Sequence, residues 1–353
     1  MQIVSWNVNG LMACIDKKGF EPIQALNPDI VCCQEVRTQR RPKILPGYIH
    51  YWETGKREGY AGVLTMVKKE PVKAMTGLGN ESLDREGRII TLEYQAFYLI
   101  NAYFPNANAL DGPDRRSFRA RWDEALLSYV GDLMESKPVI ICGDFNVTRS
   151  GIDVFPENTR IQEQEKGYIS VERDNLEALL DSGFVDAYRH LHPDQEGAYT
   201  WWSQRFDKRS LNDGWRLDYF LVARQLAKRI KGVEHLTEIY GSDHCPVLLK
   251  IHLNYAAGEK FDRSQLRTMR PSIDFPDKFL GELWNEIDWP AAERTLADLQ
   301  KQLAMAAQRR DQEKITALQK LIVRRTEVKQ LAVRKVCAGD SGPGVDGVKW
   351  KEP

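Results

Sequence analysis

Short apolar runs alternate with polar loops and a few helical segments from residue 1 to residue 253. Runs rich in β-branched and aromatic residues between turn-forming residues predict strands. We therefore expect strands at residues 3–6, 29–34, 63–68, 88–93, 98–103, 139–142, 217–222 and 247–251. Apolar residues at helical spacing predict helices at residues 20–26, 114–135 and 174–181. Many strands with few helices favour an α/β (α+β) fold in which two packed sheets carry helices on their outer faces.

The pattern changes after the last of these strands. Residues 254–283 are polar, contain two prolines and lack periodicity, which is typical of a linker. Apolar spacing then predicts two helices, one beginning at Pro290 and one over residues 311–336. The sequence thus predicts a large domain at residues 1–253, a linker, and a C-terminal helical extension at residues 284–353.

Composition excludes several classes of function. The chain has 353 residues and a mass of 40.6 kDa, and its 50 Lys and Arg balance its 50 Asp and Glu. Net charge therefore indicates no particular class of partner, and any surface that binds nucleic acid must be a local basic patch. No apolar run approaches the roughly 18 residues of a membrane span. The six cysteines form no CxxC pair, and the N-terminus enters a strand without a secretory signal. We expect a monomeric, cytoplasmic protein with reduced thiols and no membrane association.

Polar residues follow several of the predicted strands at their C-terminal ends. These residues are Asn7, Glu35, Asn106, Asp144, Asn146, Asp218, Asp243 and His244. Carboxylate and amide oxygens favour Mg²⁺ or Mn²⁺ over zinc. A hard cation beside an imidazole and an aspartate suits phosphodiester chemistry, in which the cation neutralises phosphate charge and a base activates water. Each residue alone fits a turn former or a helix cap, but turn chemistry hardly explains so many independent strand ends.

Six motifs occur in a characteristic order along residues 1–253. They are SWNVNGL at 5–11, CQEV at 33–36, NAYFPNA at 101–107, CGDFNV at 142–147, GWRLDYFLV at 214–222 and GSDHCP at 241–246. In these motifs the chain resembles the exonuclease III family, the abasic-site (AP) endonuclease branch of the DNase I-like phosphodiesterases. The resemblance implies a four-layer αββα sandwich of two mixed β-sheets flanked by helices. It also implies Mg²⁺-dependent cleavage of double-stranded DNA 5′ to abasic sites in base excision repair, with Mn²⁺ as a substitute. Removal of blocked 3′ ends and 3′→5′ exonuclease action are implied companions.

The same resemblance implies a role for each motif residue. For the metal it implies Asn7, Glu35, Asp144, Asn146, Asp243 and His244, with Glu35 as the principal ligand. For catalysis it implies Tyr103, Asp144, Asn146, Asp218 and His244. For the substrate it implies Tyr60, Asn106, Trp201, Trp215 and Leu217. His244 would contact the scissile phosphate with Asp218 orienting it, while Asp144 would activate water or protonate the leaving oxygen. The tryptophans and Leu217 would wall a pocket for a flipped sugar, although a Trp pair alone would indicate core packing.

Two departures from the family pattern concern the metal and the DNA. Asn9 stands where some relatives carry Asp, so its share in metal binding stays open. The loop after Asn106 lacks the Arg that some relatives insert into DNA. Candidates for phosphate contact are Arg57, Arg115, Arg116, Arg119 and Arg121, the last four of which fit a solvated helix face equally well.

Residues 284–353 resemble the N-terminal segment of group II intron reverse transcriptases. Residues 309–335 are basic and helical in pattern, which suits non-specific contact with RNA or DNA. The alternative is a fusion remnant without a role. Two rival functions stay open for the whole chain: another phosphodiesterase of the same superfamily acting on RNA or a lipid, and a nucleic-acid-binding fusion protein that uses the basic C-terminal helices.

Overall fold

The computed structural model describes most of the chain outside the predicted linker. Described are residues 1–107, 115–156, 170–253, 255 and 289–308, together with Ile315, Leu318, Gln319, Ile322, Leu331 and Arg334. Contacts divide the chain into two compact units, Met1–Ser272 and Ile273–Pro353. The predicted linker, apart from Tyr255, and most of the helix predicted at residues 311–336 lie outside the described residues, so the boundaries at 253 and 284 stay predictions.

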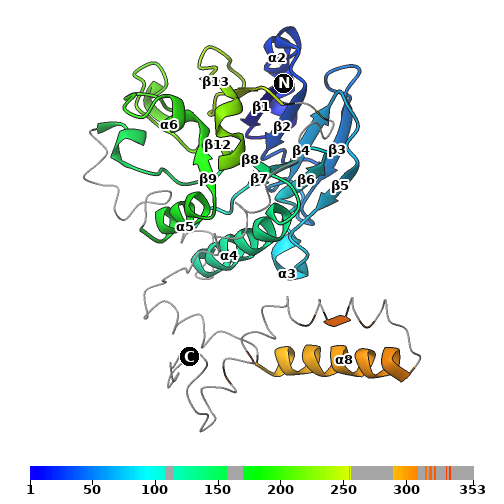
Figure 1. Ribbon diagram of the computed structural model, residues 1–353. Helices are drawn as coiled ribbons and strands as arrows, with labels where there is room; N and C mark the ends of the chain where they lie inside the picture. The colour runs from blue at the N-terminus through cyan, green and yellow to red at the C-terminus, as the bar shows by residue number, and fades with distance from the viewer. Residues whose placement is uncertain are drawn as a thin grey trace. The chain divides into compact units, whose positions relative to one another are not determined.

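The first unit contains two six-stranded sheets (Figure 1). The first sheet has the order β13-β14-β1-β2-β4-β3. Its strands are β13 (Ile230–His235), β14 (Val247–Ile251), β1 (Gln2–Asn7), β2 (Ile30–Gln34), β4 (Val63–Val67) and β3 (Ile49–Glu53). Only β1 and β2 pair in parallel, so the sheet is mixed.

The second sheet has the order β5-β6-β7-β8-β12-β9 and is also mixed, because β7 and β8 pair in parallel. Its strands are β5 (Lys73–Thr76), β6 (Ile89–Glu93), β7 (Tyr98–Tyr103), β8 (Val139–Asp144), β12 (Asp218–Ala223) and β9 (Phe184–Asp186). A separate two-stranded ribbon joins β10 (Trp201–Trp202) to β11 (Gly214–Trp215).

Helices cover the outer face of each sheet. These helices are α1 (Leu11–Asp16), α2 (Phe20–Leu26), α3 (Glu81–Asp84), α4 (Arg115–Met134) and α5 (Ser170–Asp181). A further helix, α6 (Ala187–Leu191), packs against strands of both sheets and contributes Ala187 to the core between them. In Figure 1, α2 lies at the top of this unit and α4 and α5 lie side by side along its lower side.

Alternation along the strands builds three apolar layers, since successive side chains point to opposite faces of a sheet. Ile3, Cys142 and Phe220 belong to the core between the two sheets. Val4 belongs to the cluster under α1 and α2, and Ile141 belongs to the cluster under α4 and α5. The unit is therefore a four-layer αββα sandwich, and the predicted fold class is confirmed.

The described part of the second unit centres on α8 (Trp289–Gln308). Leu299 and Ala306 of this helix pack with Leu318, and Leu303, Ile315 and Ile322 join the same cluster. The guanidinium of Arg334 lies 4.5 Å from the ring centre of Trp289 and 3.7 Å from the Glu293 carboxylate. None of the helices in the described residues has the length and apolar character needed to cross a membrane.

Candidate functional site

The strand ends of both sheets meet at one edge of the sandwich. Asn7 ends β1, and Glu35 directly follows β2, the parallel neighbour of β1 in the first sheet. In the second sheet Asp144 ends β8 between Asp218 of β12 and Tyr103 of β7, both of which are its register partners. The polar residues that the sequence places at strand ends are thus brought together.

Asn7 joins carboxylates from the two sheets. Its buried amide nitrogen Nδ2 donates to Glu35 Oε2 and to Asp144 Oδ2, both at 2.8 Å. Glu35 adopts φ 57°, which is uncommon for a residue other than glycine and costs about 1–3 kcal/mol. Its second oxygen accepts a short hydrogen bond from Arg37. The fold therefore holds Glu35 in a strained backbone position so that its carboxylate faces that of Asp144.

His244 carries a positive charge set by aspartates. Its Nδ1 lies 2.8 Å from Asp218 Oδ2, and Nε2 lies 4.0 Å from Asp144 Oδ2. Burial disfavours a charged imidazole, but Asp218 foremost, then Asp144 and Asp243, outweigh burial and raise the pKa of His244 to about 10. The imidazole is therefore a fixed cation at neutral pH.

The pKa of the Asp144 carboxyl lies close to neutral pH. Burial raises its pKa and Asp218 adds to this rise, while the His244 cation and hydrogen bonds from Asn146 and Asn7 lower it, with a net pKa of about 7. The hydrogen bonds come from the Asn146 backbone N–H and the Asn7 amide, each at 2.8 Å. A carboxyl with this pKa can hold or release a proton at neutral pH.

Asp243 faces the same space from the loop before β14. Its Oδ1 accepts from Asn9 Nδ2 at 2.8 Å, and its Oδ2 accepts from the Trp201 indole at 3.2 Å. Asn9, whose role the sequence leaves open, thus holds the Asp243 carboxylate in place.

A cavity of about 260 Å³ opens among these groups. It is lined by Asn9, Glu35, Arg37, Tyr103, Asn106, Asp144, Asn146, Trp201, Trp215, Leu217, Asp243 and His244. Asn7 and Asp218 do not line it, because they lie behind Glu35, Asp144 and His244. Tyr60 lies apart from it.

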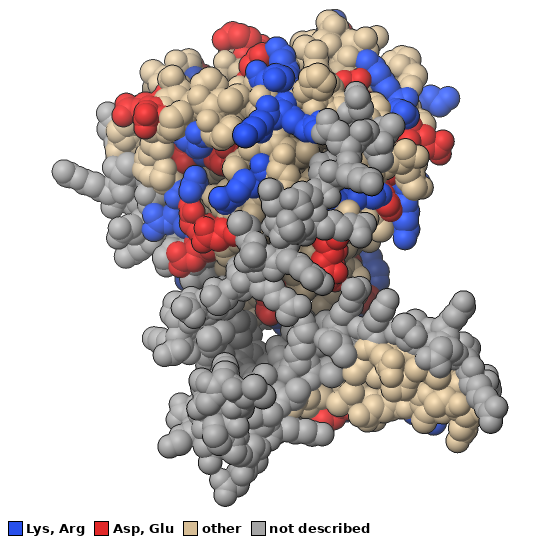
Figure 2. Space-filling view, in the orientation of Figure 1, with Lys and Arg blue, Asp and Glu red and all other residues tan. Residues whose placement is uncertain are grey.

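Tyr60 borders a second cavity of about 490 Å³, together with Arg57 and Arg115. The phenol accepts a hydrogen bond from buried Arg88 at 3.3 Å, and the guanidinium of Arg57 lies 5.1 Å from the centre of its ring. On the face shown in Figure 2, Lys and Arg side chains lie among Asp and Glu side chains over the first unit instead of forming a surface of one sign.

The arginines of α4 divide into two groups. Arg116 and Arg121 are exposed, as a solvated helix face requires. Arg115 pairs with Glu86 at 2.7 Å, and Arg119 is buried against Asp123, also at 2.7 Å. These two arginines instead support the cavity rim, since Arg115 donates to the Asn106 carbonyl and Arg119 to the Pro105 carbonyl.

Sequence reasoning misses two residues that complete the site. Arg37 pairs with Glu35 and lines the cavity, and its place two residues beyond Glu35 is the only signal for it. Thr200 uses its hydroxyl oxygen to accept from the backbone N–H groups of Leu217 and Asp218, at 3.0 and 3.1 Å. No spacing in the sequence connects Thr200 with these residues.

The donor set fits a hard divalent cation that keeps several waters. Among the described residues, no group of three or more His, Cys, Asp or Glu side chains forms a metal-holding cluster. Mg²⁺ seldom uses such an all-protein cage and is commonly bound through one or two carboxylates. Glu35 and Asp144 share one amide donor at the cavity, and burial keeps the pKa of Asp144 raised, which a nearby cation would relieve.

Comparison with known families gives two matches. Residues 4–244 match the model described as the Endonuclease/Exonuclease/phosphatase family. Residues 284–353 match the model described as the N-terminal domain of reverse transcriptase. Every residue that lines the 260 Å³ cavity falls within the first match.

Three individual relatives cover the same part of the chain. An exodeoxyribonuclease of Bacillus subtilis (strain 168) is 41% identical over 256 residues, which are 72% of this chain and 100% of the relative. A DNA-(apurinic or apyrimidinic site) endonuclease of Dictyostelium discoideum is 38% identical over 260 residues, 72% of this chain and 71% of the relative. The solved structure of a 3′ phosphatase from Neisseria bound to a product DNA hairpin superposes with a TM-score of 0.63 at 29% identity, covering 72% of this chain and 100% of that one.

Proposed function

This chain belongs to the Endonuclease/Exonuclease/phosphatase family and is a DNA repair nuclease, and from that premise we propose its substrate and cofactor. It hydrolyses the phosphodiester bond 5′ to abasic sites in double-stranded DNA, with Mg²⁺ as cofactor and Mn²⁺ as a substitute. It also removes blocked 3′ ends and acts as a 3′→5′ exonuclease on duplex DNA.

One observation carries the proposal: a single cavity joins the acid–imidazole centre to an aromatic and apolar wall. Trp201, Trp215 and Leu217 form that wall, which suits a sugar that has lost its base. A missing base also lowers the cost of extruding the nucleotide, normally a few kcal/mol, because less stacking is broken. The wall therefore supports selection of abasic sites over intact nucleotides.

The charges of the centre suit phosphate hydrolysis. The His244 cation, with Asp218 behind it, binds and orients the phosphate, and Tyr103, Asn106 and Asn146 line the remaining space. Asp144, with a pKa of about 7, takes the proton of the attacking water or returns one to the leaving oxygen. Glu35 as principal ligand, with Asn7, Asp144, Asn146 and Asp243 around it, would hold the Mg²⁺, whereas the protonated His244, also expected from the sequence to be a ligand, has no lone pair for a metal ion. When bound, the cation supplies charge neutralisation at the phosphate and lowers the pKa of bound water.

The test is a 5′-labelled duplex that carries one abasic site, incubated in Mg²⁺ with and without a chelator. We expect one cut 5′ to the site in Mg²⁺, no cut with the chelator, and losses of at least about 10²-fold for Glu35→Ala and His244→Ala. A matched intact duplex measures selectivity for the abasic site.

The proposal would be contradicted if the abasic duplex stayed uncut in Mg²⁺, or if either variant kept full activity. Equal cutting of abasic and intact duplexes would instead revive the alternative of another phosphodiesterase of the superfamily, to be assayed on RNA and on a lipid phosphodiester.

For the second unit we propose non-specific contact with RNA or DNA. Its support is the basic composition of residues 309–335 and the reverse-transcriptase match. Removing residues 254–353 is expected to weaken binding of RNA in low salt while the abasic cut stays unchanged; unchanged binding favours a fusion remnant without a role. A monomeric state and a cytoplasmic location complete the proposal.

A further inference from the structure

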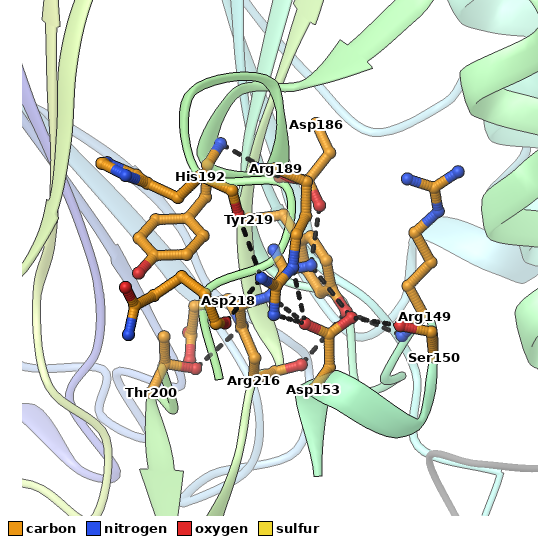
Figure 3. Close-up of polar contacts among 12 residues, drawn as sticks. Arg149, Ser150, Asp153, Asp186, Arg189, His192, Thr200, Arg216, Asp218 and Tyr219 are labelled. Atoms are coloured by element: carbon orange, nitrogen blue, oxygen red, sulfur yellow. Dashed lines mark hydrogen bonds and ion pairs between the residues drawn. The ribbon is translucent and has the colours of Figure 1, made fainter. Parts of the chain in front are cut away.

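A buried ion network surrounds Arg216, the residue between Trp215 and Leu217 of the substrate wall. Figure 3 shows the polar contacts of this network. Asp153, Asp186, Arg189 and Arg216 form it, and we call these four residues the ion network. Arg216 donates Nε to Asp153 Oδ1 at 2.7 Å, and Nη2 to Asp153 Oδ2 at 3.1 Å and to Asp186 Oδ2 at 2.7 Å. Arg189 donates Nη2 to Asp153 Oδ1 at 2.6 Å. Asp153 and Arg216 are both 0% exposed, so neither meets solvent.

The ion network is anchored on elements that are remote in sequence. Asp153 ends the 3₁₀ helix Gly151–Asp153, Asp186 ends β9 and caps α6, and Arg189 lies on α6. Arg216 stands between β11 and β12. Its guanidinium also lies 4.4 Å from the ring centre of Tyr219. Three chain segments are thus fixed around one pair of arginines, because β9 runs directly into α6.

The segment that carries Arg216 also carries the wall of the cavity. Trp215 and Leu217 line the cavity, whereas Arg216 between them is paired in the interior, as expected when successive side chains alternate in direction. The next residue, Asp218, holds the His244 imidazole. The position of Arg216 therefore affects where Trp215 and Leu217 lie, whereas Asp218 is also held by the pairing of β12 with β8.

Backbone contacts hold this segment from both sides. The Arg216 N–H donates to the Asp153 carbonyl at 2.9 Å, and Val154 forms a β-bridge with Trp215. On the other side the Thr200 hydroxyl accepts from the N–H groups of Leu217 and Asp218. Asp153 thus contacts the segment of the wall twice: its carboxylate pairs with the Arg216 guanidinium, and its carbonyl accepts from the Arg216 N–H.

A network of this kind is a poor way to gain stability but a good way to fix geometry. Replacing a buried ion pair by apolar residues of similar volume is often neutral or stabilising, because desolvation of the charges offsets their attraction. A planar guanidinium with two bonds to one carboxylate accepts only one orientation, whereas an apolar contact tolerates shifts. A misplacement of about 1 Å in a substrate-positioning group costs about 10²-fold in rate.

We propose that Asp153 and Arg216 are positioning residues for substrate selection: through the ion network they fix Trp215 and Leu217 against the abasic sugar without touching it. This inference rests on the proposed function, since it concerns the wall of that same cavity. Loss of the network shifts the wall and lowers discrimination, while the acid–imidazole centre keeps its groups.

The test compares two reactions of the same protein preparation. For each variant, kcat/KM is measured for the cut at an abasic site and for removal of the 3′-terminal nucleotide of an intact duplex, well below the melting temperature. Their ratio does not depend on the fraction of folded protein, so a merely structural effect leaves it unchanged. We expect Asp153→Asn to lower the ratio by about 10-fold or more.

Two further variants separate positioning from stability. Leu126→Ala removes a buried side chain of α4 and is expected to lower the melting temperature while leaving the ratio within about 2-fold of wild type. The double variant Asp153→Leu with Arg216→Met exchanges the ion pair for apolar groups. It allows the ratio to be measured without the ion pair even if Asp153→Asn fails to fold.

If the double variant is stable and its ratio stays low, the proposal holds. If its ratio returns to the wild-type value, the ion network serves the fold alone and the proposal is overturned, as it also is if Asp153→Asn folds and keeps the wild-type ratio. A wild-type protein that does not cut the abasic duplex contradicts the proposed function instead, so the two failures are distinguishable.

Discussion

The acid–imidazole centre and the ion network, with His235 beside it, are both buried groups of charged residues, but their aspartates and histidines have opposite proton affinities. In the centre, burial raises the pKa of Asp144 to about 7; in the ion network, Arg216 and Arg189 outweigh the effect of burial and lower the pKa of Asp153. Asp218 and its neighbouring carboxylates raise the pKa of His244 to about 10 against the effect of burial. Burial, with Arg216 and Arg189, lowers the pKa of His235, beside the network, to about 3.

Burial is common to these four groups. It leads the pKa shifts of Asp144 and His235, whereas at Asp153 and His244 the charges of neighbouring residues outweigh it. The centre has a surplus of carboxylates, which favours bound protons and a bound metal ion and keeps His244 positively charged. The ion network pairs two arginines with two aspartates, which leaves no free charge for a ligand and repels a proton from His235. Buried charged side chains thus form a reactive site where their charges are unbalanced and a rigid support where their charges are balanced.

Asp144→Asn gives the largest expected effect and separates the two regions through activity. The amide cannot exchange the proton that the carboxyl with a pKa of about 7 exchanges, so kcat should fall by about 10²–10⁴-fold. The free energy of unfolding should change by less than about 1 kcal/mol, because no arginine is left unpaired. Steady-state kinetics and urea denaturation in chelator measure both; a destabilisation as large as that of Asp153→Asn would remove the contrast.

Asp153→Asn should show the converse pattern. Neutralising it leaves two buried arginines with one carboxylate, so the free energy of unfolding should fall by about 3–5 kcal/mol. Cleavage of the terminal nucleotide should fall far less than in Asp144→Asn. Denaturant melts at pH 7, with the m-value checked for two-state behaviour, provide the measurement.

Metal-linked stability gives a third contrast. If the surplus carboxylates hold Mg²⁺, the cation at about 100 times its Kd should stabilise the wild-type protein by about 2.7 kcal/mol over a chelated sample. Glu35→Gln should lose most of this gain, and Asp153→Asn should keep it. Thermal melts over a series of Mg²⁺ concentrations test this, and an equal loss in both variants would show that the two regions are not independent.

The pH dependence of stability provides the smallest effect. His235 has both ring nitrogens buried without a hydrogen-bond partner among the described residues. Because its folded pKa of about 3 lies below the ordinary value of about 6.5, the unfolded chain takes up the proton first. Its contribution is complete above pH 6.5 and is lost as pH falls toward 3, by about 1.4 kcal/mol per pH unit at most.

His235→Phe should remove this loss. The phenyl ring keeps the place stacked 4.3 Å from the Tyr188 ring but cannot take up a proton. Between pH 7 and pH 5 the wild-type protein should lose about 2 kcal/mol more stability than the variant. The shift of His244 acts at higher pH, where stability falls as pH rises from 6.5 toward 10, and it is common to both proteins. Equal pH profiles would show that the network does not repel this proton.

The sequence predicts the buried strands well and the edges of the sheets poorly. Strands such as β2 and β8 are buried along their whole length, so their apolar runs are unambiguous. The edge strands β3 and β5 go unpredicted, because β3 is only half-buried and β5 is short and largely exposed. Strand β13 is also an edge and is interrupted by a register shift at Gly232.

In the site, likewise, residues within motifs could be predicted from the sequence, whereas contacts between remote segments could not. Glu35 directly follows β2, Asp144 ends β8 and His244 lies in the loop before β14, so motif and position along the chain point to them. The partner of Arg216 could not be predicted, because Asp153 lies 63 residues away and its segment carries no motif. Thr200 likewise acts on Leu217 from 17 residues away through a single hydroxyl. Contacts of this kind depend on the packing of remote segments, which periodicity does not record.

The pairing of β1 with β14 has a consequence for how the catalytic unit accommodates added sequence. Gln2 pairs with Lys250 and the Met1 amine donates to the Ile251 carbonyl at 2.9 Å, whereas Asn7 and His244 stand at the other end of the same two strands. The chain therefore leaves the sheet at the edge opposite the cavity. A circularly permuted chain, with a short loop joining residues 253 and 1, should keep both strands in register. The topology thus separates the ends of β1 and β14 that carry Met1 and Ile251 from the ends that bring Asn7 and His244 to the cavity.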